Sequence, residues 1–325
     1  MAHAFDYELT ELHSHIGGAV SPEIMWSLAH SQGIKTKNRD YWEFLETITV
    51  NPLQPKSFEG YLKLFDTTEL IQSSPEGMEE SALSVVSGAY RKNLITRLEM
   101  RFNPMLRNRN GERDLDHIIL ATIRGMERAT LEYPIRAGLI IMLDRRFSPR
   151  QNEVLVEKAI KYRHRGVVGI DVGGPQNPAY KVEDIAELYA KAASAGLGLT
   201  AHAGEETSDN LASTIEELGV SRIGHGVKAV GRPELLALLR DKGVTLELCP
   251  SSNLSTGVVS DKSELAKIVK TLLDEEIKFT INTDGPEMLQ TSLRKERALL
   301  KDGGMLDDDQ LLQCEQWARE ASFLR

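Results

Sequence analysis

The chain has 325 residues, a hydrophobic fraction of 41% and a formal net charge of -9. This length fits one α/β barrel or about two smaller domains, and the acidic balance argues against nucleic acid or an anionic membrane as the main partner. Its two cysteines, Cys249 and Cys314, lie too far apart in so long a chain to form a disulfide framework, so we expect two buried thiols.

Apolar, strand-like runs alternate with amphipathic helical stretches along the chain. The eight runs are 7–15, 95–103, 135–143, 166–172, 197–203, 221–225, 243–249 and 277–282. Helical periodicity fills the intervals, for example over 182–195, 210–218, 233–241 and 262–275. Gly166, Gly196 and Gly243 stand where a glycine is expected between a helix and the next strand.

This alternation predicts parallel βαβ units, and eight such units predict a (β/α)₈ TIM barrel as a single domain over residues 1–325. A doubly wound open sheet is the alternative, which the lack of a GxGxxG motif after the first run disfavours. Segment 21–87 has several helical stretches, around Leu28, Trp42, Tyr61 and Leu64. We predict that it is an insertion after the first strand that roofs the barrel mouth.

Metal-ligating side chains stand at the ends of predicted strands, where TIM-barrel active sites are built. His13 and His15 end the first run and share a face, because residues two apart on a strand point the same way. His202 ends the fifth run, and Asp284 follows the eighth. Three imidazoles and a carboxylate suit one catalytic zinc ion, which lowers the pKa of a bound water to about 7. Iron, manganese or cobalt is the alternative, since such sites also follow metal availability.

Two further residues at these strand ends suit proton transfer. Glu205 follows His202 by three residues, and partial burial would raise its pKa to that of a general acid. His225 lies between two glycines, which let the backbone approach a ligand closely. The structural alternatives are a helix-capping role for Glu205 and a hydrogen-bonded core role for His225. We expect surface or structural roles for the remaining histidines, His3, His30, His117 and His164.

These motifs resemble those of the adenosine deaminase family, in the family's order and over most of the chain. They are HSH at 13–15, GIDVGG at 169–174, HAGE at 202–205, GHG at 224–226, CPSSN at 249–253 and NTDGP at 282–286. The resemblance implies a zinc-dependent hydrolase that removes the C6 amino group of an adenine nucleoside as ammonia and leaves the 6-oxo purine.

The resemblance also implies a role for each site residue. The metal ligands would be His13, His15, His202 and Asp284. Glu205 would donate a proton to N1 of the purine, while His225 and Asp284 would orient and deprotonate the attacking water. Gly174 would contact the purine through its backbone, and His15 would also lie against the substrate.

Two positions depart from the family's usual pattern, and both concern substrate recognition. Gly17 stands where an aspartate usually bonds the ribose, and Gly285 stands where a second aspartate usually bonds purine N7. A site that no longer hydrogen-bonds a substrate group loses discrimination for that group. We therefore predict adenosine or a 5′-modified adenosine, such as aminodeoxyfutalosine, as the substrate, with room made by Gly17. The alternative is that other residues, including those of the roof, restore the contacts to adenosine.

Other functions remain open from the residues alone. One is a mononuclear metal aminohydrolase that acts on another aza-aromatic amine, such as a pterin or pyrimidine, or on a small amide. Another is a barrel kept only for binding, which the presence of all four ligands and both proton carriers disfavours. Arg101 ends the second run and is expected to pair with a barrel-mouth acid such as Glu11 or to meet an anionic substrate group.

The expected partner is a small-molecule nucleoside rather than nucleic acid or a membrane. The sequence has no run of about 18 apolar residues. It also has no basic segment followed by an apolar stretch ahead of the first histidine pair. We accordingly expect a cytoplasmic protein.

Overall fold

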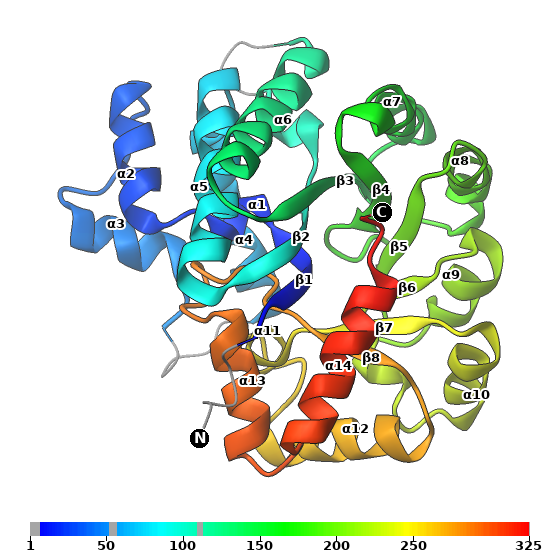
Figure 1. Cartoon of the computed structure of the whole chain (residues 1–325). Coiled ribbons are helices and arrows are strands. Elements are labelled where there is room, and N and C mark those ends of the chain that lie inside the picture. The colour runs from blue at the N-terminus through cyan, green and yellow to red at the C-terminus, as the bar shows by residue number, and fades with distance from the viewer. Residues whose placement is uncertain (1–6, 52–56, 109–112, 325) are drawn as a thin grey trace.

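A computed structural model describes residues 7–51, 57–108 and 113–324 (Figure 1). Its eight strands pair in parallel, in chain order from β1 to β8. They are β1 (Leu9–His15), β2 (Ile95–Phe102), β3 (Arg136–Asp144), β4 (Val167–Gly173), β5 (Gly198–Ala203), β6 (Arg222–His225), β7 (Thr245–Leu248) and β8 (Phe279–Ile281). An isolated bridge between Ser14 of β1 and Asp284, just after β8, closes the sheet, so the predicted (β/α)₈ TIM barrel is confirmed.

Helices return the chain from strand to strand on the outside of the sheet. They are α5 (Pro75–Asn93), α6 (Leu115–Glu132), α7 (Pro149–Lys161), α8 (Glu183–Ser194), α9 (Leu211–Leu218), α10 (Pro233–Lys242), α12 (Lys262–Asp274), α13 (Leu293–Asp302) and α14 (Asp308–Ala321). Shorter turns are η1 (Pro104–Arg107), η2 (Arg163–Arg165), η3 (Val227–Ala229) and α11 (Pro250–Ser255). Gly166, Gly196 and Gly243 adopt the positive φ angles that a helix-ending glycine permits, as predicted.

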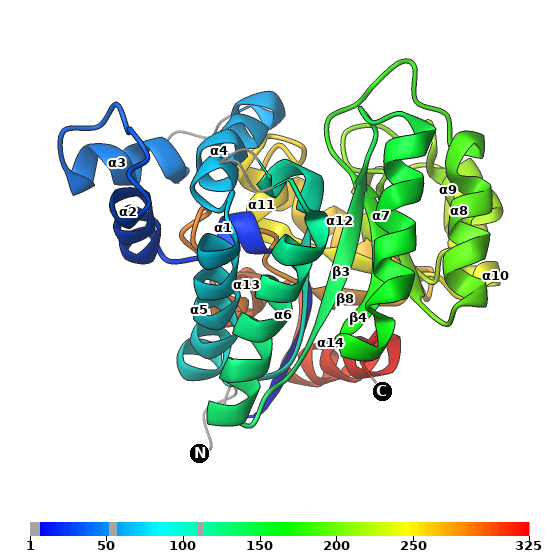
Figure 2. The same ribbon diagram turned by 90° about the horizontal axis from the view of Figure 1, so that it is seen from above.

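The helical roof consists of α1 (Ile16–Ala19), α2 (Pro22–Ser31), α3 (Tyr41–Ile48) and α4 (Phe58–Ile71). Figure 2 shows α4 at one end of the barrel and α14 at the other, with α2 and α3 to one side. The predicted insertion over 21–87 extends too far, because its last part belongs to α5. That helix packs against α6 and β2 as an ordinary helix of the barrel. No helix in the described part of the chain is both long and apolar enough to cross a bilayer.

Glu296 of α13 is fully buried and ties the segment after β7 to the segment after β8. Its carboxylate accepts hydrogen bonds from the backbone N–H of Ser251, at 2.9 Å, and from the hydroxyl of Thr291. Burial raises the pKa of Glu296 to about 7. The pKa of a glutamate in an unfolded chain is about 4.3. Between this pKa and that of the folded state, the folded chain therefore binds more protons than the unfolded chain. The resulting stabilisation is present below the lower pKa and is lost as pH rises through the upper one.

Replacement of Glu296 by glutamine is expected to flatten the pH dependence of stability between about pH 5 and pH 8. The amide keeps a donor and an acceptor but never ionises. Over this window the unfolding free energy of the wild type should fall relative to the variant by up to about 3 kcal/mol. Urea unfolding at several pH values measures this difference, with the exposed Glu216→Gln as control. Parallel profiles for the wild type and Glu296→Gln would contradict the expectation.

Candidate active site

The polar residues at the strand ends surround one cavity of about 240 Å³ beneath α4. Its wall includes the predicted site residues His15, Gly174, His202, Glu205, His225 and Asp284. His13 lies directly below them and is fully buried. The other histidines that the structure describes, His30, His117 and His164, do not line this cavity, and His3 lies outside the described residues.

The three predicted histidine ligands converge, and Asp284, from the opposite end of the chain, approaches one of them. One ring nitrogen from each of His13, His15 and His202 lies within 4.8 Å of the others. The Nε2 atoms of His15 and His202 are 3.2 Å apart. The Oδ1 atom of Asp284 is 3.4 Å from Nε2 of His15. Backbone hydrogen bonds between Asp284 and the first strand fix this approach.

The hydrogen bonds below the cavity leave imidazole lone pairs free to bind a cation. Nδ1 of His13 lies 2.6 Å from Glu247, and Nδ1 of His202 lies 2.9 Å from Asp171. A carboxylate at Nδ1 keeps the proton on that nitrogen and leaves Nε2 as an acceptor. Nε2 of His13 is buried and has no hydrogen-bond partner among the described residues. Burial lowers the pKa of His13 and of His15 well below the usual value, so both rings are neutral, as metal ligands must be.

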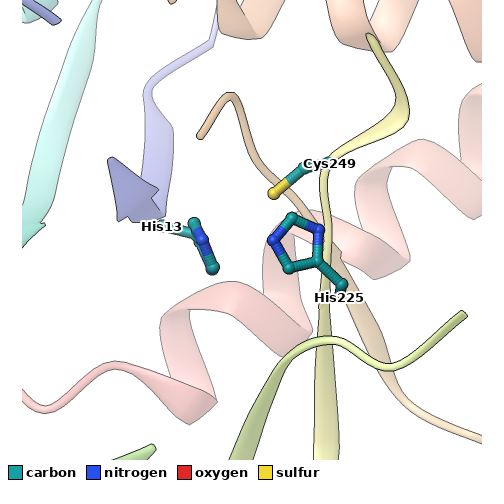
Figure 3. Close-up of side chains that lie close together, drawn as sticks. All are labelled: His13, His225 and Cys249. Carbon is teal, nitrogen blue, oxygen red and sulfur yellow. The ribbon is translucent and has the colours of Figure 1, made fainter. Parts of the chain in front are cut away.

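Cys249 forms a second group with His13 and His225, which Figure 3 shows with the thiol directed at the two rings. Burial raises the pKa of the Cys249 thiol well above its ordinary value. Its Sγ lies 3.6 Å from the backbone carbonyl of Glu247, to which the thiol donates. A protonated thiol is a poor metal ligand. The orphaned Nε2 of His13 therefore fits a cation held on the side of His15 and His202.

The two residues predicted to transfer protons lie side by side in the cavity wall. Oε1 of Glu205 lies 3.5 Å from Nε2 of His225, whose Nδ1 contacts the amide of Asn253 at 3.1 Å. Burial, and then the nearby charge of Asp284, raise the pKa of Glu205 well above its ordinary value. Burial lowers the pKa of His225 well below its ordinary value. The pair thus consists of a protonated acid and a neutral base.

Two site residues adopt a backbone conformation that non-glycine residues rarely use. The φ angles are 64° for His225 and 63° for Asp284. Such left-handed residues cluster at functional sites, where the surrounding structure holds them in place. The hydroxyl of Ser252 donates to Oδ2 of Asp284 at 2.6 Å and leaves the other oxygen turned toward His15.

A buried ionic network that the sequence analysis did not identify lies below the histidines. Arg101 binds Asp171 at 2.9 Å and Glu247 at 2.8 Å, the two carboxylates that contact the rings of His202 and His13. Arg222 binds the other oxygen of Glu247 at 2.6 Å and Glu99 at 2.7 Å. Burial alone would raise the pKa of Asp171, but the neighbouring His202 and Arg101 outweigh it and lower that pKa to about 2.

The prediction that Arg101 pairs with Glu11 is wrong, because the Glu11 carboxylate accepts hydrogen bonds from other groups. Glu11 accepts from the backbone N–H of His13 and from the hydroxyl of Thr283. A signal for the network was nevertheless present in the sequence. Glu99 and Arg101 alternate with apolar residues within one strand, so both point to the same face of the sheet.

Replacement of Arg101 by methionine is expected to lower the unfolding free energy by about 3 to 5 kcal/mol. The change removes the partner of two fully buried carboxylates, Asp171 and Glu247, and leaves them without compensation. Urea unfolding of metal-free protein measures the loss. The control is Arg128→Met, whose half-exposed pair with Glu79 should contribute less than about 1 kcal/mol. Equal stability of the two variants would show that the network is not needed for folding.

The two positions that depart from the family pattern lie behind the cavity wall. Neither Gly17 nor Gly285 is among the described residues that line the cavity. A Cβ at Gly17 would lie 2.9 Å from the ring of Phe65 and 3.2 Å from the guanidinium of Arg107. The room expected beside Gly17 is therefore already filled by side chains of α4 and η1. Gly174, by contrast, does line the cavity, with a φ of 87°.

Comparison with known proteins connects this geometry to a family. The profile of the adenosine deaminase family matches residues 9–325. The chain belongs to the adenosine deaminase family. Adenosine deaminase of Vibrio vulnificus is 31% identical over 294 residues, which cover 90% of this chain and 87% of the relative. As a member of this family the protein is a hydrolase that acts on carbon–nitrogen bonds.

Solved structures of low sequence identity share the fold. An adenine deaminase from Arthrobacter aurescens has a TM-score of 0.85 at 21% identity, covering 98% of this chain and 94% of its own. An amidohydrolase from Burkholderia ambifaria with bound zinc has a TM-score of 0.87 at 22% identity. The match covers 99% of this chain and 87% of the amidohydrolase. These two proteins therefore share the fold of this chain over almost its whole length.

Proposed function

We propose that this chain is a zinc-dependent hydrolytic deaminase of an adenine nucleoside, which releases ammonia and leaves the 6-oxo purine. One observation carries the proposal. Three imidazoles lie within ligand distance of one another, and the carboxylate of Asp284 approaches one of them beside a buried, protonated Glu205. The bound zinc of the Burkholderia ambifaria relative supports the choice of metal. The name of the Vibrio vulnificus relative supports the choice of substrate class.

The residues present fit one zinc ion per chain, held by His13, His15, His202 and Asp284. When bound, zinc supplies a Lewis acid that makes a water nucleophilic at neutral pH. The remaining ring nitrogens of His13 and His202 stay bonded to their carboxylates, which keeps both rings oriented for binding.

The proton steps fall to three side chains. Glu205 donates its proton to the ring nitrogen beside the amino-bearing carbon, which makes that carbon electrophilic. His225 and Asp284 hold the attacking water and accept its proton. The amino group gains that proton and leaves as ammonia, while the added hydroxyl returns its proton to the carboxylate of Glu205 as the 6-oxo group forms. Burial keeps the acid protonated and the imidazole neutral, as each role requires.

The cavity suits a polar, uncharged or weakly charged nucleoside. Cationic groups of Lys63, Arg107 and Arg146 line it together with the acids Glu69 and Asp144. Arg107 pairs with Glu69 at 2.7 Å, and Arg146 pairs with Asp144 at 2.6 Å. Adenosine and a 5′-modified adenosine such as aminodeoxyfutalosine are the two proposed substrates. Side chains fill the space beside Gly17, so this position offers no extra room that would favour the larger substrate, aminodeoxyfutalosine.

A substrate panel scored by ammonia release tests this proposal. The ammonia that the purified protein releases is measured with adenosine, aminodeoxyfutalosine, adenine, a pterin that carries an amino group, and cytidine. The metal content of the protein is determined by elemental analysis. We expect the highest kcat/KM on one of the two adenine nucleosides, together with zinc near one equivalent. Faster release from the pterin or pyrimidine would favour the alternative aza-aromatic amine. Greater activity after reloading with iron, manganese or cobalt would show that this metal, rather than zinc, is the cofactor.

A further inference from the structure

A tyrosine of the roof carries a buried hydroxyl that forms no hydrogen bond of good geometry with the described residues. Tyr61 of α4 is 2% exposed and lines the cavity. Its hydroxyl makes no well-formed hydrogen bond to the described residues, and the carboxylate of Asp284 is the acceptor close to it. Buried polar groups are almost always hydrogen-bonded, so a hydroxyl left in this state at a cavity wall calls for a further partner. The Tyr61 hydroxyl is therefore a candidate contact for the substrate.

The ring of Tyr61 is firmly held, so its hydroxyl has a defined position. Tyr61 packs in an apolar cluster with Val50, Leu64, Met288 and Leu289. Its ring also meets that of Phe65 edge to face, with centroids 5.5 Å apart. The hydroxyl oxygen lies 3.0 Å from the position that a Cβ on Gly285 would occupy. The tyrosine thus places a hydrogen-bond donor where residue 285 has no side chain.

This donor and Glu205 approach the cavity from two different sides. Glu205 follows β5, whereas Gly285 follows β8, three strands further around the barrel. In adenine, the amino-bearing carbon lies between N1 and the carbon that carries N7. N7 has a lone pair and no hydrogen, so it accepts a hydrogen bond. When Glu205 faces N1, the other edge of the ring presents N7 to a donor on the β8 side.

We infer that the Tyr61 hydroxyl donates a hydrogen bond to N7 of the adenine ring and makes the protein selective for purines that keep this nitrogen. The inference rests on the proposed function, because it requires an adenine-type ring in the cavity. A site built to hydrogen-bond a substrate atom rejects analogues that lack the atom, since its own polar group is then left unpaired. The competing role for this hydroxyl is a bond to the Asp284 carboxylate, which would make Tyr61 a positioning residue for the metal.

The test compares two non-reacting ligands that differ at one ring atom. Inosine and 7-deazainosine are used as competitive inhibitors of the zinc enzyme, and the inhibition constant of each is measured. We expect the wild type to bind inosine more tightly than 7-deazainosine by at least about 10-fold. In Tyr61→Phe this ratio should fall to about 1 to 3, because the partner of N7 is gone. Tyr41→Phe removes a roof hydroxyl that bonds Glu23 outside the cavity, and it should keep the wild-type ratio.

Each other outcome overturns the inference in a recognisable way. A ratio near 1 in the wild type would exclude N7 recognition without reference to any variant. An unchanged ratio in Tyr61→Phe would show that another group bonds N7. Equal weakening of both inhibitors, with reduced zinc content, would assign the hydroxyl to Asp284 instead. Failure of the proposed function gives a different result, namely no ammonia from any adenine nucleoside and no inhibition by inosine.

Discussion

Replacement of Glu205 by glutamine is expected to lower kcat/KM for the best adenine nucleoside by about 100-fold to 10,000-fold. The amide keeps the size and the hydrogen bonds of the side chain but has no transferable proton at neutral pH. Metal content should not change, because Glu205 contacts His225 rather than the converging ligand atoms. Steady-state ammonia release, read beside zinc content, measures the effect.

The matched control is Glu206→Gln, one residue further along the same loop. Glu206 is half-buried and does not line the cavity among its described residues. Its variant should keep kcat/KM within about 3-fold of the wild type. In the wild type, activity should also fall as pH rises through the elevated pKa of Glu205, because the acid form is then lost. Comparable losses in both variants would remove Glu205 from its proposed role as general acid.

Replacement of Asp284 by asparagine is expected to weaken zinc binding by at least about 100-fold and to abolish most of the turnover. Asparagine is the suitable substitution because it tolerates the left-handed φ of 63° at this position, which alanine would strain. The change removes the only carboxylate proposed as a ligand and one of the two groups that accept the proton of water. Competition with a chelator measures zinc affinity, and ammonia release at saturating zinc measures the chemical step.

Asp302→Asn is the control, because this aspartate is exposed at the end of α13. Thermal unfolding of metal-free protein should give similar midpoints for Asp284→Asn and Asp302→Asn. Zinc affinity within about 10-fold of the wild type, with turnover preserved, would mean that Asp284 does not bind the metal.

That the candidate ligands lie together could be predicted, because each stands at the end of an apolar run and parallel strands of a barrel end at one face. His13 and His15 were paired by the period of a strand alone. The burial that raises the pKa of Glu205 could not be predicted, because it depends on the roof that covers the cavity. The same holds for Arg101, whose acidic partners belong to β4 and β7 rather than to the neighbouring β1.

By itself, the sequence determined the strand order and the family and indicated the candidate catalytic side chains, because periodicity and motif spacing are local properties of the chain. Only the tertiary structure decided which side chains lie in the space beside Gly17 and Gly285. Phe65 and Arg107 fill the first, and the Tyr61 hydroxyl faces the second. These contacts arise where α4 and η1 pack over the barrel mouth, and such packing joins residues whose separation along the chain has no fixed period. The proposed substrate contacts therefore lie in the roof, while the residues proposed for the reaction lie at the strand ends.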